Sequence, residues 1–256
     1  MQQLDVPYEI VISDDCSTDS TRKIIEEFAR KDARIRVLPS TKNVGMHGNW
    51  LQAIEGCKGE FVALCEGDDF WTDKNKLSKQ LKVLHDNPTL TGCFTNADIL
   101  EFNGSIVPAG YVTITNTLLR ANDLLALHYN PVPTCTLVFR KRMFNGFPEI
   151  YYQSPFADRI LHTVLILKGD YFFLNEATAQ YRKHNEGVWS GIRVQKQHQN
   201  TLKSLRILEK LVPLASHKQL VRNSICKQLD LMLYHYRNEH DYLAYWKTWF
   251  KLRTVA

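Results

Sequence analysis

Short apolar runs rich in β-branched residues alternate with helical segments over the first 90 residues of the chain. Three such runs read as strands, and they occupy residues 9–13, 35–40 and 59–65. A polar turn follows each run, and the segment after the third turn places Leu77, Leu81 and Leu84 at helical spacing. Strands that alternate with helices form parallel sheets that helices cover on both faces. The sequence therefore predicts an α/β fold with a doubly wound, mostly parallel sheet.

Two acidic turns stand at the carboxyl ends of predicted strands. Asp14 and Asp15 follow the first strand, and the stretch EGDDFW, with Glu66, Asp68 and Asp69, follows the third. Ligands of open α/β sheets bind beyond these ends. Carboxylates this close raise one another's pKa unless a cation compensates, and Mg²⁺ or Mn²⁺ binds such oxygens together with phosphates. We therefore expect a shared metal and nucleotide site, although capping of the next helix is the commoner role of an isolated Asp-Asp pair.

The pattern changes past the third helix, where short strand candidates are separated by loops rich in Asn, Pro and Gly. A helix is predicted from Asp158 to Lys168, with a strand at 171–174 behind it. The last sixty residues have long helical patterns with clustered aromatics. We therefore predict two parts, an α/β domain over residues 1–190 and a C-terminal helical extension over residues 191–256.

Composition and charge limit the partners and the cellular location that we expect for this chain. The formal net charge of +5 is too small to indicate nucleic acid by itself, and it suits an anionic small molecule or an anionic membrane surface. The sequence contains no run of about 18 apolar residues, so it predicts no membrane-spanning helix. It also shows no secretory signal at its start. Six cysteines occur without a C-x-x-C pair, which favours reduced thiols. We expect a cytoplasmic protein that binds no nucleic acid, with any membrane contact peripheral and at the inner face of the cell membrane.

Taken in order, these motifs resemble those of the family 2 glycosyltransferases, which have the GT-A fold. The strand with the first acidic turn, EIVISDDCSTDST, is similar to the nucleotide motif of that family, and EGDDFW is similar to its DxD-type metal motif. Further matches are NVGMHGNW, which resembles an N-x-G segment, ADRILHTVLILKG, which resembles an ED-x-x-L…G segment, and QYRKH, which resembles a closing Y-R-x-H motif. The ordered set, over roughly residues 9–190, is far more specific than any one motif.

The resemblance implies a role for each polar residue of the motifs. Asp158 would be the general base that takes the proton of the acceptor hydroxyl. Contacts to the donor nucleotide would come from Asp14, Asp15, Asn43, Asp68 and Arg182, with Asp15 reading the base and Asn43 alternatively shaping a turn. The implied metal ligands are Asp69, Glu66 and His184, and the metal would be Mn²⁺ or Mg²⁺ bridging the diphosphate.

The implied function is sugar transfer with inversion at the sugar carbon. The donor would be a nucleotide diphosphate sugar, UDP-sugar by default, and the acceptor a hydroxyl of a glycan or of a lipid-linked molecule. Assembly of cell-envelope polysaccharide or lipopolysaccharide is the expected setting.

Three departures from the family pattern keep a second function open. Glu66 stands where Asp is common, Ala157 stands where Glu usually precedes the catalytic Asp, and the first strand and helix of the family are missing ahead of residue 9. That strand would lie in the middle of the sheet, so its two neighbours would have exposed edges. We expect a truncated chain or a misplaced start, with poor stability and weak activity, and the alternative function is a catalytically inactive binding module. A phosphoryl-transfer enzyme is less favoured, because DDCSTD lacks the Asp pair two residues apart that such an enzyme needs.

Aromatic and basic residues are interleaved from Tyr234 to Arg253. Such a helix can settle at a membrane interface, which would suit a lipid-linked acceptor. The other interpretation, which is slightly favoured, is that these aromatics cover the α/β domain or a partner subunit. The role of Trp71 also has two interpretations: its ring either stacks on a sugar or packs inside the protein.

Overall fold

The computed structural model describes residues 2–109, 112 and 117–255. The strands are β1 (Ile10–Ile12), β2 (Ile35–Val37), β3 (Phe61–Ala63), β4 (Phe70–Trp71), β5 (Gly92–Leu100), β6 (Ile106–Val107), β7 (Leu118–Leu119), β8 (Val138–Arg140) and β9 (Tyr171–Arg182). The α-helices are α1 (Thr21–Lys31), α2 (Gly45–Gly56), α3 (Lys76–Asp86), α4 (Ala121–Leu125), α5 (Asp158–Ile166), α6 (Val194–Leu211), α7 (Ala215–Asn238) and α8 (Tyr242–Val255). Single turns of 3₁₀-helix are η1 (Thr134–Thr136), η2 (Lys141–Met143) and η3 (Glu149–Gln153).

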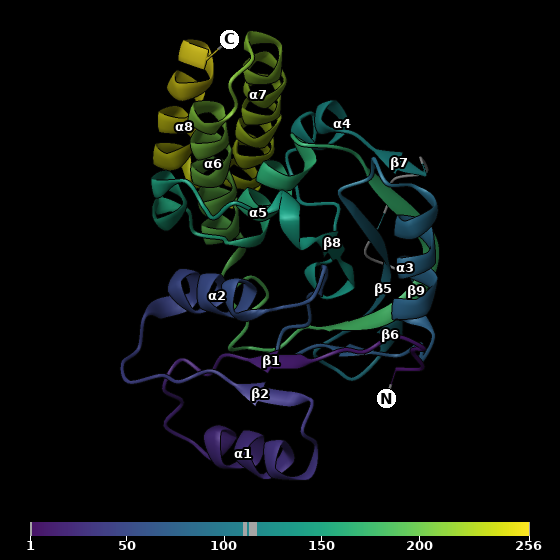
Figure 1. Ribbon diagram of the computed structural model, residues 1–256. Helices are drawn as coiled ribbons and strands as arrows, with labels where there is room; N and C mark the ends of the chain where they lie inside the picture. The colour runs from purple at the N-terminus through teal and green to yellow at the C-terminus, as the bar shows by residue number, and fades with distance from the viewer. Residues whose placement is uncertain (1, 110–111, 113–116, 256) are drawn as a thin grey trace.

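The α/β class is confirmed, with the C-terminal helices stacked together at one end and β1, β2 and α1 at the opposite end (Figure 1). The prediction of a mostly parallel sheet is wrong, because the larger sheet is mixed. Its order is β3–β8–β5–β9–β4, with β6 beside β5 and β7 beside β9. Only β5 and β9 run parallel within it, and its other ladders among the described strands are antiparallel. Parallel neighbours are usually joined by a long crossover helix, whereas the described part of the chain between β5 and β8 forms only the short elements β6, β7, α4 and η1.

β1 and β2 form a separate parallel pair, in which Ile10 lies opposite Ile35. Among the strands that the structure describes, β1 pairs with β2 alone and β3 pairs with β8 alone. Each of these two strands therefore has one edge without a ladder partner among the described strands. Ile24 and Phe28 of α1 are also exposed, at 48% and 59%, so this small unit buries little apolar surface of its own.

Two buried apolar clusters make up most of the core. The first lies between the sheet and α5, where Phe94 of β5 and Phe173 of β9 stack at 5.1 Å and pack with Leu161 and Leu165 of α5. All six cysteines are free, so packing rather than a disulfide holds these layers together. The sheet, with α5 on it, is the rigid support for the residues that follow β3 and β9.

The second cluster joins the C-terminal helices to the α/β part. Leu208 of α6 and Leu229 of α7 share this cluster with Ile160 of α5. The Ser224 hydroxyl of α7 also donates a buried hydrogen bond to the carbonyl of Leu125, at 2.8 Å. We propose that residues 191–256 are an extension that completes this core, rather than a domain that folds by itself.

Truncating Leu229 tests the shared core, because this side chain is fully buried in the second cluster. We expect Leu229→Ala to lower the free energy of unfolding by about 2–5 kcal/mol, in a single cooperative transition followed by urea titration with circular dichroism and tryptophan fluorescence. The matched control is Leu231→Ala, because Leu231 lies on the same helix and is 40% exposed; its effect should stay within about 0.5 kcal/mol. Two separate transitions, of which only one responds to Leu229→Ala, would show an independent helical domain.

Candidate active site

The EGDD turn and the end of β9 lie side by side. β4, which follows the turn, pairs antiparallel with β9, so the turn meets the chain just past that strand. The backbone amide of Arg182 donates to Asp69 Oδ1 at 2.9 Å, and His184 Nε2 lies 2.9 Å from Asp68 Oδ2. The structure thus brings together four predicted site residues from motifs that are 113 to 116 residues apart.

Helix capping does not account for this acidic turn. The helix that follows, α3, begins at Lys76, and the short strand β4 stands between it and the turn. Asp73 is the residue that binds the backbone at the start of this helix, since its Oδ1 accepts a hydrogen bond from the Asn75 amide at 2.8 Å. The common alternative role of Asp68 and Asp69 is therefore excluded.

Glu66 and Asp69 are held close together without enough compensating charge. Glu66 Oε2 is buried and has no hydrogen-bond partner. Burial, and then the charge of Asp69, raises the pKa of Glu66 well above its ordinary value. Burial also raises the pKa of Asp69 to about 6, although the hydrogen bond from the Arg182 amide lowers it. A buried carboxylate with no partner is costly when it is ionised, and a bound cation would compensate the charge of this pair.

The residues present fit a divalent metal held partly by the protein. Among the described residues, no three His, Cys, Asp or Glu side chains are grouped as a complete metal site. Mg²⁺ and Mn²⁺ suit such a partial set, because they take one or two carboxylates and fill their shell with water and substrate phosphates. Asp69 and the unpartnered Glu66 oxygen would supply the hard oxygen atoms. His184 Nε2 lies 2.9 Å from Asp68 Oδ2 and fixes that side chain.

Arg182 presents a positive charge next to the acidic turn. Its side chain is exposed, and its guanidinium lies 5.8 Å from the centre of the Phe70 ring. In the part of the chain that the structure describes, this guanidinium has no carboxylate partner, whereas the next residue, Lys183, pairs with Glu101 at 2.8 Å. An arginine in this position can bind a diphosphate through two parallel hydrogen bonds.

Asp158 is the first residue of α5 and is held from two sides. Asp158 Oδ2 accepts a hydrogen bond from Asn130 Nδ2 at 2.7 Å, and Asp158 Oδ1 accepts one from the Arg159 amide at 2.6 Å. Burial raises the pKa of Asp158, while the bond from Asn130 lowers it. The charge of Asp158 in turn raises the pKa of Glu66. The candidate base is therefore within electrostatic reach of the EGDD turn.

Asn130 was missed by sequence reasoning. It lies in a loop, 28 residues before its partner Asp158, and its own Oδ1 accepts a hydrogen bond from the Val132 amide at 3.2 Å. The only local signal was an Asn directly before a Pro in HYNPVP, which marks a turn without indicating a partner. Asn130 orients the carboxylate of Asp158, so it is a positioning residue.

The first acidic turn is held by its own contacts. Asp14 is 6% exposed and accepts hydrogen bonds from the Ser17 amide, at 3.3 Å, and from the Ser17 hydroxyl. Asp15 Oδ1 accepts a hydrogen bond from the Val44 amide at 2.7 Å, and Asn43 Nδ2 donates to the carbonyl of Asp15 at 3.1 Å. No hydrogen bond or ion pair in the described part links Asp14 or Asp15 to the EGDD turn. These contacts fix the loop between β1 and α1 and join it to the residues just ahead of α2, and nucleotide binding by Asp14 and Asp15 stays a prediction.

Trp71 packs inside the protein. Its Nε1 donates to the carbonyl of Cys135 at 2.7 Å, and Lys76 Nζ lies over its ring, 4.6 Å from the centre. Lys76 is itself fully buried, and its Nζ donates to Gln80 at 2.7 Å. One face of the Trp71 ring is therefore occupied by a cation, and packing rather than sugar stacking accounts for this residue.

Comparison with known sequences gives three informative relatives. A protein of Mycobacterium tuberculosis is 33% identical over 189 residues, which are 73% of this chain and 54% of the relative, so the chain spans about half the length of that protein. TuaG of Bacillus subtilis, whose name refers to teichuronic acid biosynthesis, is 29% identical over 72% of this chain and 70% of its own. WfgD of Escherichia coli, named as a glucosyltransferase from UDP-Glc to a GlcNAc-diphosphoundecaprenol, is 32% identical over 42% of this chain and 40% of its own.

Two solved structures share the fold. TarS of S. aureus, solved with UDP, superposes with a TM-score of 0.59 and 19% identity over 88% of this chain and 63% of TarS. The mannosyltransferase PcManGT of Pyrobaculum calidifontis, solved with GDP-Man and Mn²⁺, gives a TM-score of 0.60 and 13% identity over 98% of this chain and 77% of its own. Both support the GT-A arrangement. The sequence profile described as "Glycosyl transferase family 2" matches residues 2–144, more than half of the chain, and this protein therefore belongs to glycosyl transferase family 2.

Proposed function

We propose that this protein transfers a sugar, with inversion, from a nucleotide diphosphate sugar to a hydroxyl of a glycan or lipid-linked acceptor. The observation that carries this proposal is the close placement of the unpartnered Glu66 oxygen, the carboxylate of Asp69, whose pKa is raised to about 6 by burial, and the exposed Arg182, whose charge acts on Asp69. This arrangement suits a diphosphate with a divalent cation. Relatives named for teichuronic acid and diphosphoundecaprenol glycan synthesis support cell-envelope polysaccharide assembly, with lipopolysaccharide as one form of it.

The chain's own residues divide the work of binding the donor. Arg182 binds the diphosphate, Asp69 and Glu66 hold the metal, and His184 fixes Asp68 near the ribose or the metal. Mn²⁺ or Mg²⁺, when bound there, neutralises the charge that develops on the leaving diphosphate. The first acidic turn, with Asp14, Asp15 and Asn43, contacts the nucleotide base, and UDP is the default nucleotide because TarS was solved with it.

The acceptor is activated from the opposite side by Asp158. Its carboxylate takes the proton of the acceptor hydroxyl as the oxygen attacks the sugar carbon, and the nucleotide diphosphate leaves with the electron pair of the broken bond. One displacement with a base on the far side of the sugar gives inversion and needs no covalent intermediate. The setting we propose is the cytoplasm, and none of the described helices is long and apolar enough to cross a bilayer.

A donor screen tests this function directly. The intact chain is incubated with UDP-glucose, UDP-N-acetylglucosamine, UDP-galactose and GDP-mannose, and release of the free nucleotide is measured with Mn²⁺, with Mg²⁺ and with chelator. We expect release from one donor class, lowered at least roughly tenfold by the chelator because the metal stabilises the leaving group. Nucleotide binding by calorimetry without turnover of any donor would instead identify a catalytically inactive binding module, the alternative that Ala157 and the two open strand edges suggest.

A further inference from the structure

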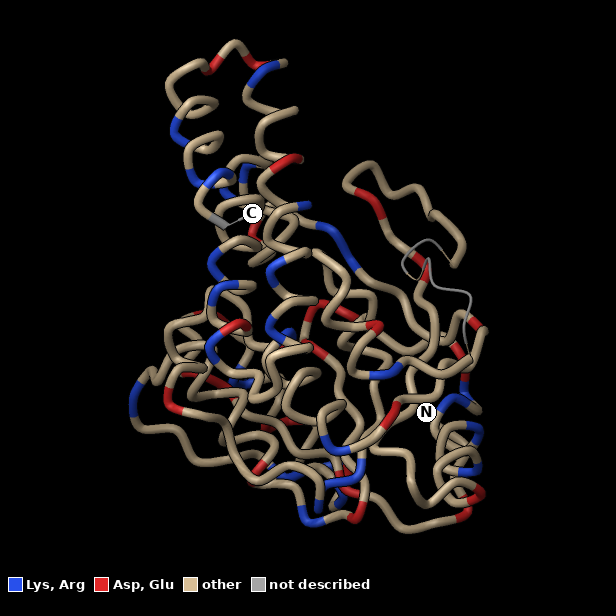
Figure 2. The backbone as a smooth tube through the Cα atoms, turned by 90° about the horizontal axis from the view of Figure 1, so that it is seen from above, with Lys and Arg blue, Asp and Glu red and all other residues tan. Residues whose placement is uncertain are grey.

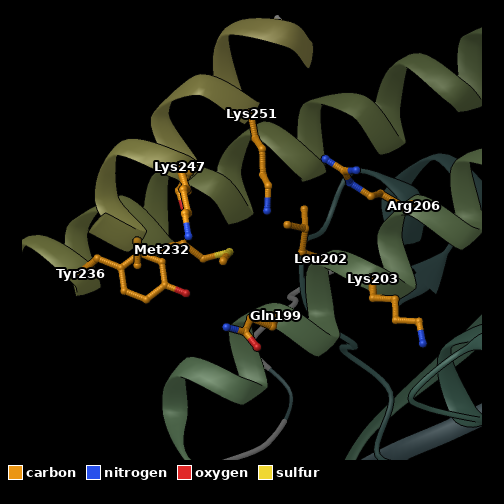
Figure 3. A pocket seen from close by; sticks show the side chains of 10 residues that line it. Gln199, Leu202, Lys203, Arg206, Met232, Tyr236, Lys247 and Lys251 are labelled. Carbon is orange, nitrogen blue, oxygen red and sulfur yellow. The ribbon is translucent and has the colours of Figure 1, made fainter. Parts of the chain in front are cut away.

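A cavity of about 320 Å³ lies between the three C-terminal helices, away from the EGDD turn. Leu202 of α6 and Met232 of α7 form its apolar wall, and α8 closes it with Lys247 and Lys251. Figure 3 shows both lysine side chains reaching from α8 toward this wall, with the guanidinium of Arg206 turned to the same space. None of its lining residues belongs to the EGDD turn, to β9 or to α5.

The positive charge around the cavity is uncompensated. Its cations are Lys203, Arg206, Lys247 and Lys251, and no Asp or Glu lines it. Within the described ranges none of these four side chains forms an ion pair, although Arg222 on the neighbouring α7 pairs with Glu209 at 2.6 Å. In the view from above, blue segments that mark Lys and Arg lie near the C-terminus (Figure 2). Arg206, Lys247 and Lys251 turn to the cavity, whereas the end of Lys203 points away from it (Figure 3). Three cations beside an apolar wall suit an anion.

An exposed apolar stripe runs along α8 beside the cavity. Leu243, Trp246 and Phe250, at spacings of three and four residues, are 68%, 54% and 63% exposed. Lys247 directly follows Trp246 and Lys251 directly follows Phe250. A basic stripe therefore lies next to the apolar stripe on this helix. Thr248, on the inner side of the helix, is 4% exposed. Cover of the α/β domain does not account for Trp246 and Phe250, which stay 54% and 63% exposed. The other half of that expectation, cover of a partner subunit, stays a prediction.

We propose that α8 docks this protein on the surface of an anionic lipid bilayer, with the phosphate of a lipid headgroup in the cavity between α6, α7 and α8. The apolar stripe would enter the boundary between headgroups and acyl chains, as interfacial helices with adjacent basic and aromatic faces do. Charge complementarity selects the occupant, because cations beside an exposed aromatic stripe match a phosphate attached to an apolar tail. A free phosphate would use the cations but leave the stripe in water. This inference does not depend on the catalytic proposal.

Vesicle flotation of the full chain tests the docking surface. We expect the protein to float with phosphatidylcholine vesicles that contain phosphatidylglycerol, not to float with pure phosphatidylcholine, and to be released by high salt. Lys247→Gln with Lys251→Gln should lower the bound fraction roughly tenfold, since each cation near an anionic surface contributes to binding. Trp246→Ala with Phe250→Ala should do the same by removing the apolar stripe.

Matched controls come from α1, at the other end of the molecule. Lys23→Gln with Lys31→Gln removes the same charge, and Ile24→Ala with Phe28→Ala removes exposed apolar side chains, 48% and 59% exposed, at the same spacing of four residues. Both controls should float like the unchanged protein, and all variants should unfold at the same urea concentration. Equal losses in the α1 and α8 variants, or no flotation with phosphatidylglycerol, would overturn the proposal.

Two further outcomes would assign the same residues to another partner. Stabilisation of the unchanged protein by inorganic phosphate, lost in the lysine variants and accompanied by no flotation, would indicate a soluble anion. A concentration-dependent dimer that Trp246→Ala with Phe250→Ala dissociates, again without flotation, would indicate that a second copy covers the stripe. Either result rejects the membrane proposal.

Discussion

Asp158→Asn is expected to lower the rate of sugar transfer by about 10²–10⁴-fold, the usual contribution of a general base, while nucleotide binding stays within about twofold. Asparagine keeps the size of the side chain and still accepts the bond from the Arg159 amide, but it cannot take a proton. Donor affinity should persist because Asp158 lies at the start of α5 and not in the EGDD turn. Steady-state transfer to acceptor, with calorimetry for nucleotide binding, measures both quantities.

The control for Asp158→Asn is Asp170→Asn, which removes a carboxylate that follows the other end of the same helix. Asp170 pairs with Arg120 at 3.7 Å on the partly exposed surface, so its loss should leave transfer unchanged. Retention of more than roughly a tenth of the transfer rate in Asp158→Asn would show that this carboxylate is not the base.

The pH profile separates a base from a merely structural carboxylate. Burial raises the pKa of Asp158 and the hydrogen bond from Asn130 lowers it. Because only the carboxylate can accept a proton, kcat/KM must fall as the pH falls through this pKa. Asn130→Ala removes a donor that stabilises the carboxylate, so the pKa rises and the acid limb moves to higher pH. Saturating Mn²⁺ is needed, since the bound cation keeps Asp69 ionised. An acid limb that does not move in Asn130→Ala would contradict the role of Asn130.

Asp69→Asn is expected to abolish the dependence of activity on the metal and to lower transfer by roughly 10²–10⁴-fold, since a bound cation provides several kcal/mol of charge stabilisation. The amide oxygen can still accept the bond from the Arg182 backbone, so the loop should keep its shape. Mn²⁺ binding, followed by electron paramagnetic resonance, should weaken in parallel with activity.

Two further variants are compared with Asp69→Asn: Glu66→Gln, which changes the second expected metal ligand, and Asp86→Asn, which is the control. Glu66 has one unpartnered oxygen. If this oxygen reaches the metal through water, Glu66→Gln should lower the transfer rate less than Asp69→Asn does. Asp86 pairs with Lys82 on the exposed side of α3 and should have no effect. A larger loss in Glu66→Gln than in Asp69→Asn would make Glu66 the principal ligand.

The sequence predicted the α/β class and the acidic turn after β3, because alternating strands and helices and the ends of strands are local signals. The residues that meet the turn from the end of β9 were predicted through the family resemblance of QYRKH. It did not predict that His184 would bind Asp68, since the choice between adjacent carboxylates depends on how β4 pairs with β9. It missed Asn130 because a loop residue carries no periodic signal. It also left α8 undecided, because a covered and an uncovered aromatic stripe have the same spacing; only the exposed fractions of Trp246 and Phe250 separate them.

The pairing of β4 with β9 also sets the shortest length of chain that can assemble the candidate active site. The segment matched by the family profile ends at residue 144, yet Asp158, Arg182 and His184 come later in the chain. Arg182 and His184 reach the acidic turn only after β9 has joined both β5 and β4. A fragment cut at the end of the matched segment would contain the EGDD turn but neither Asp158 nor Arg182. In a refolding chain, the site likewise assembles only once strands far apart in the sequence have paired, and long-range pairing of this kind is slow. Binding of the donor would then hold the two ends of this long loop together, so the substrate itself would slow the opening of the sheet.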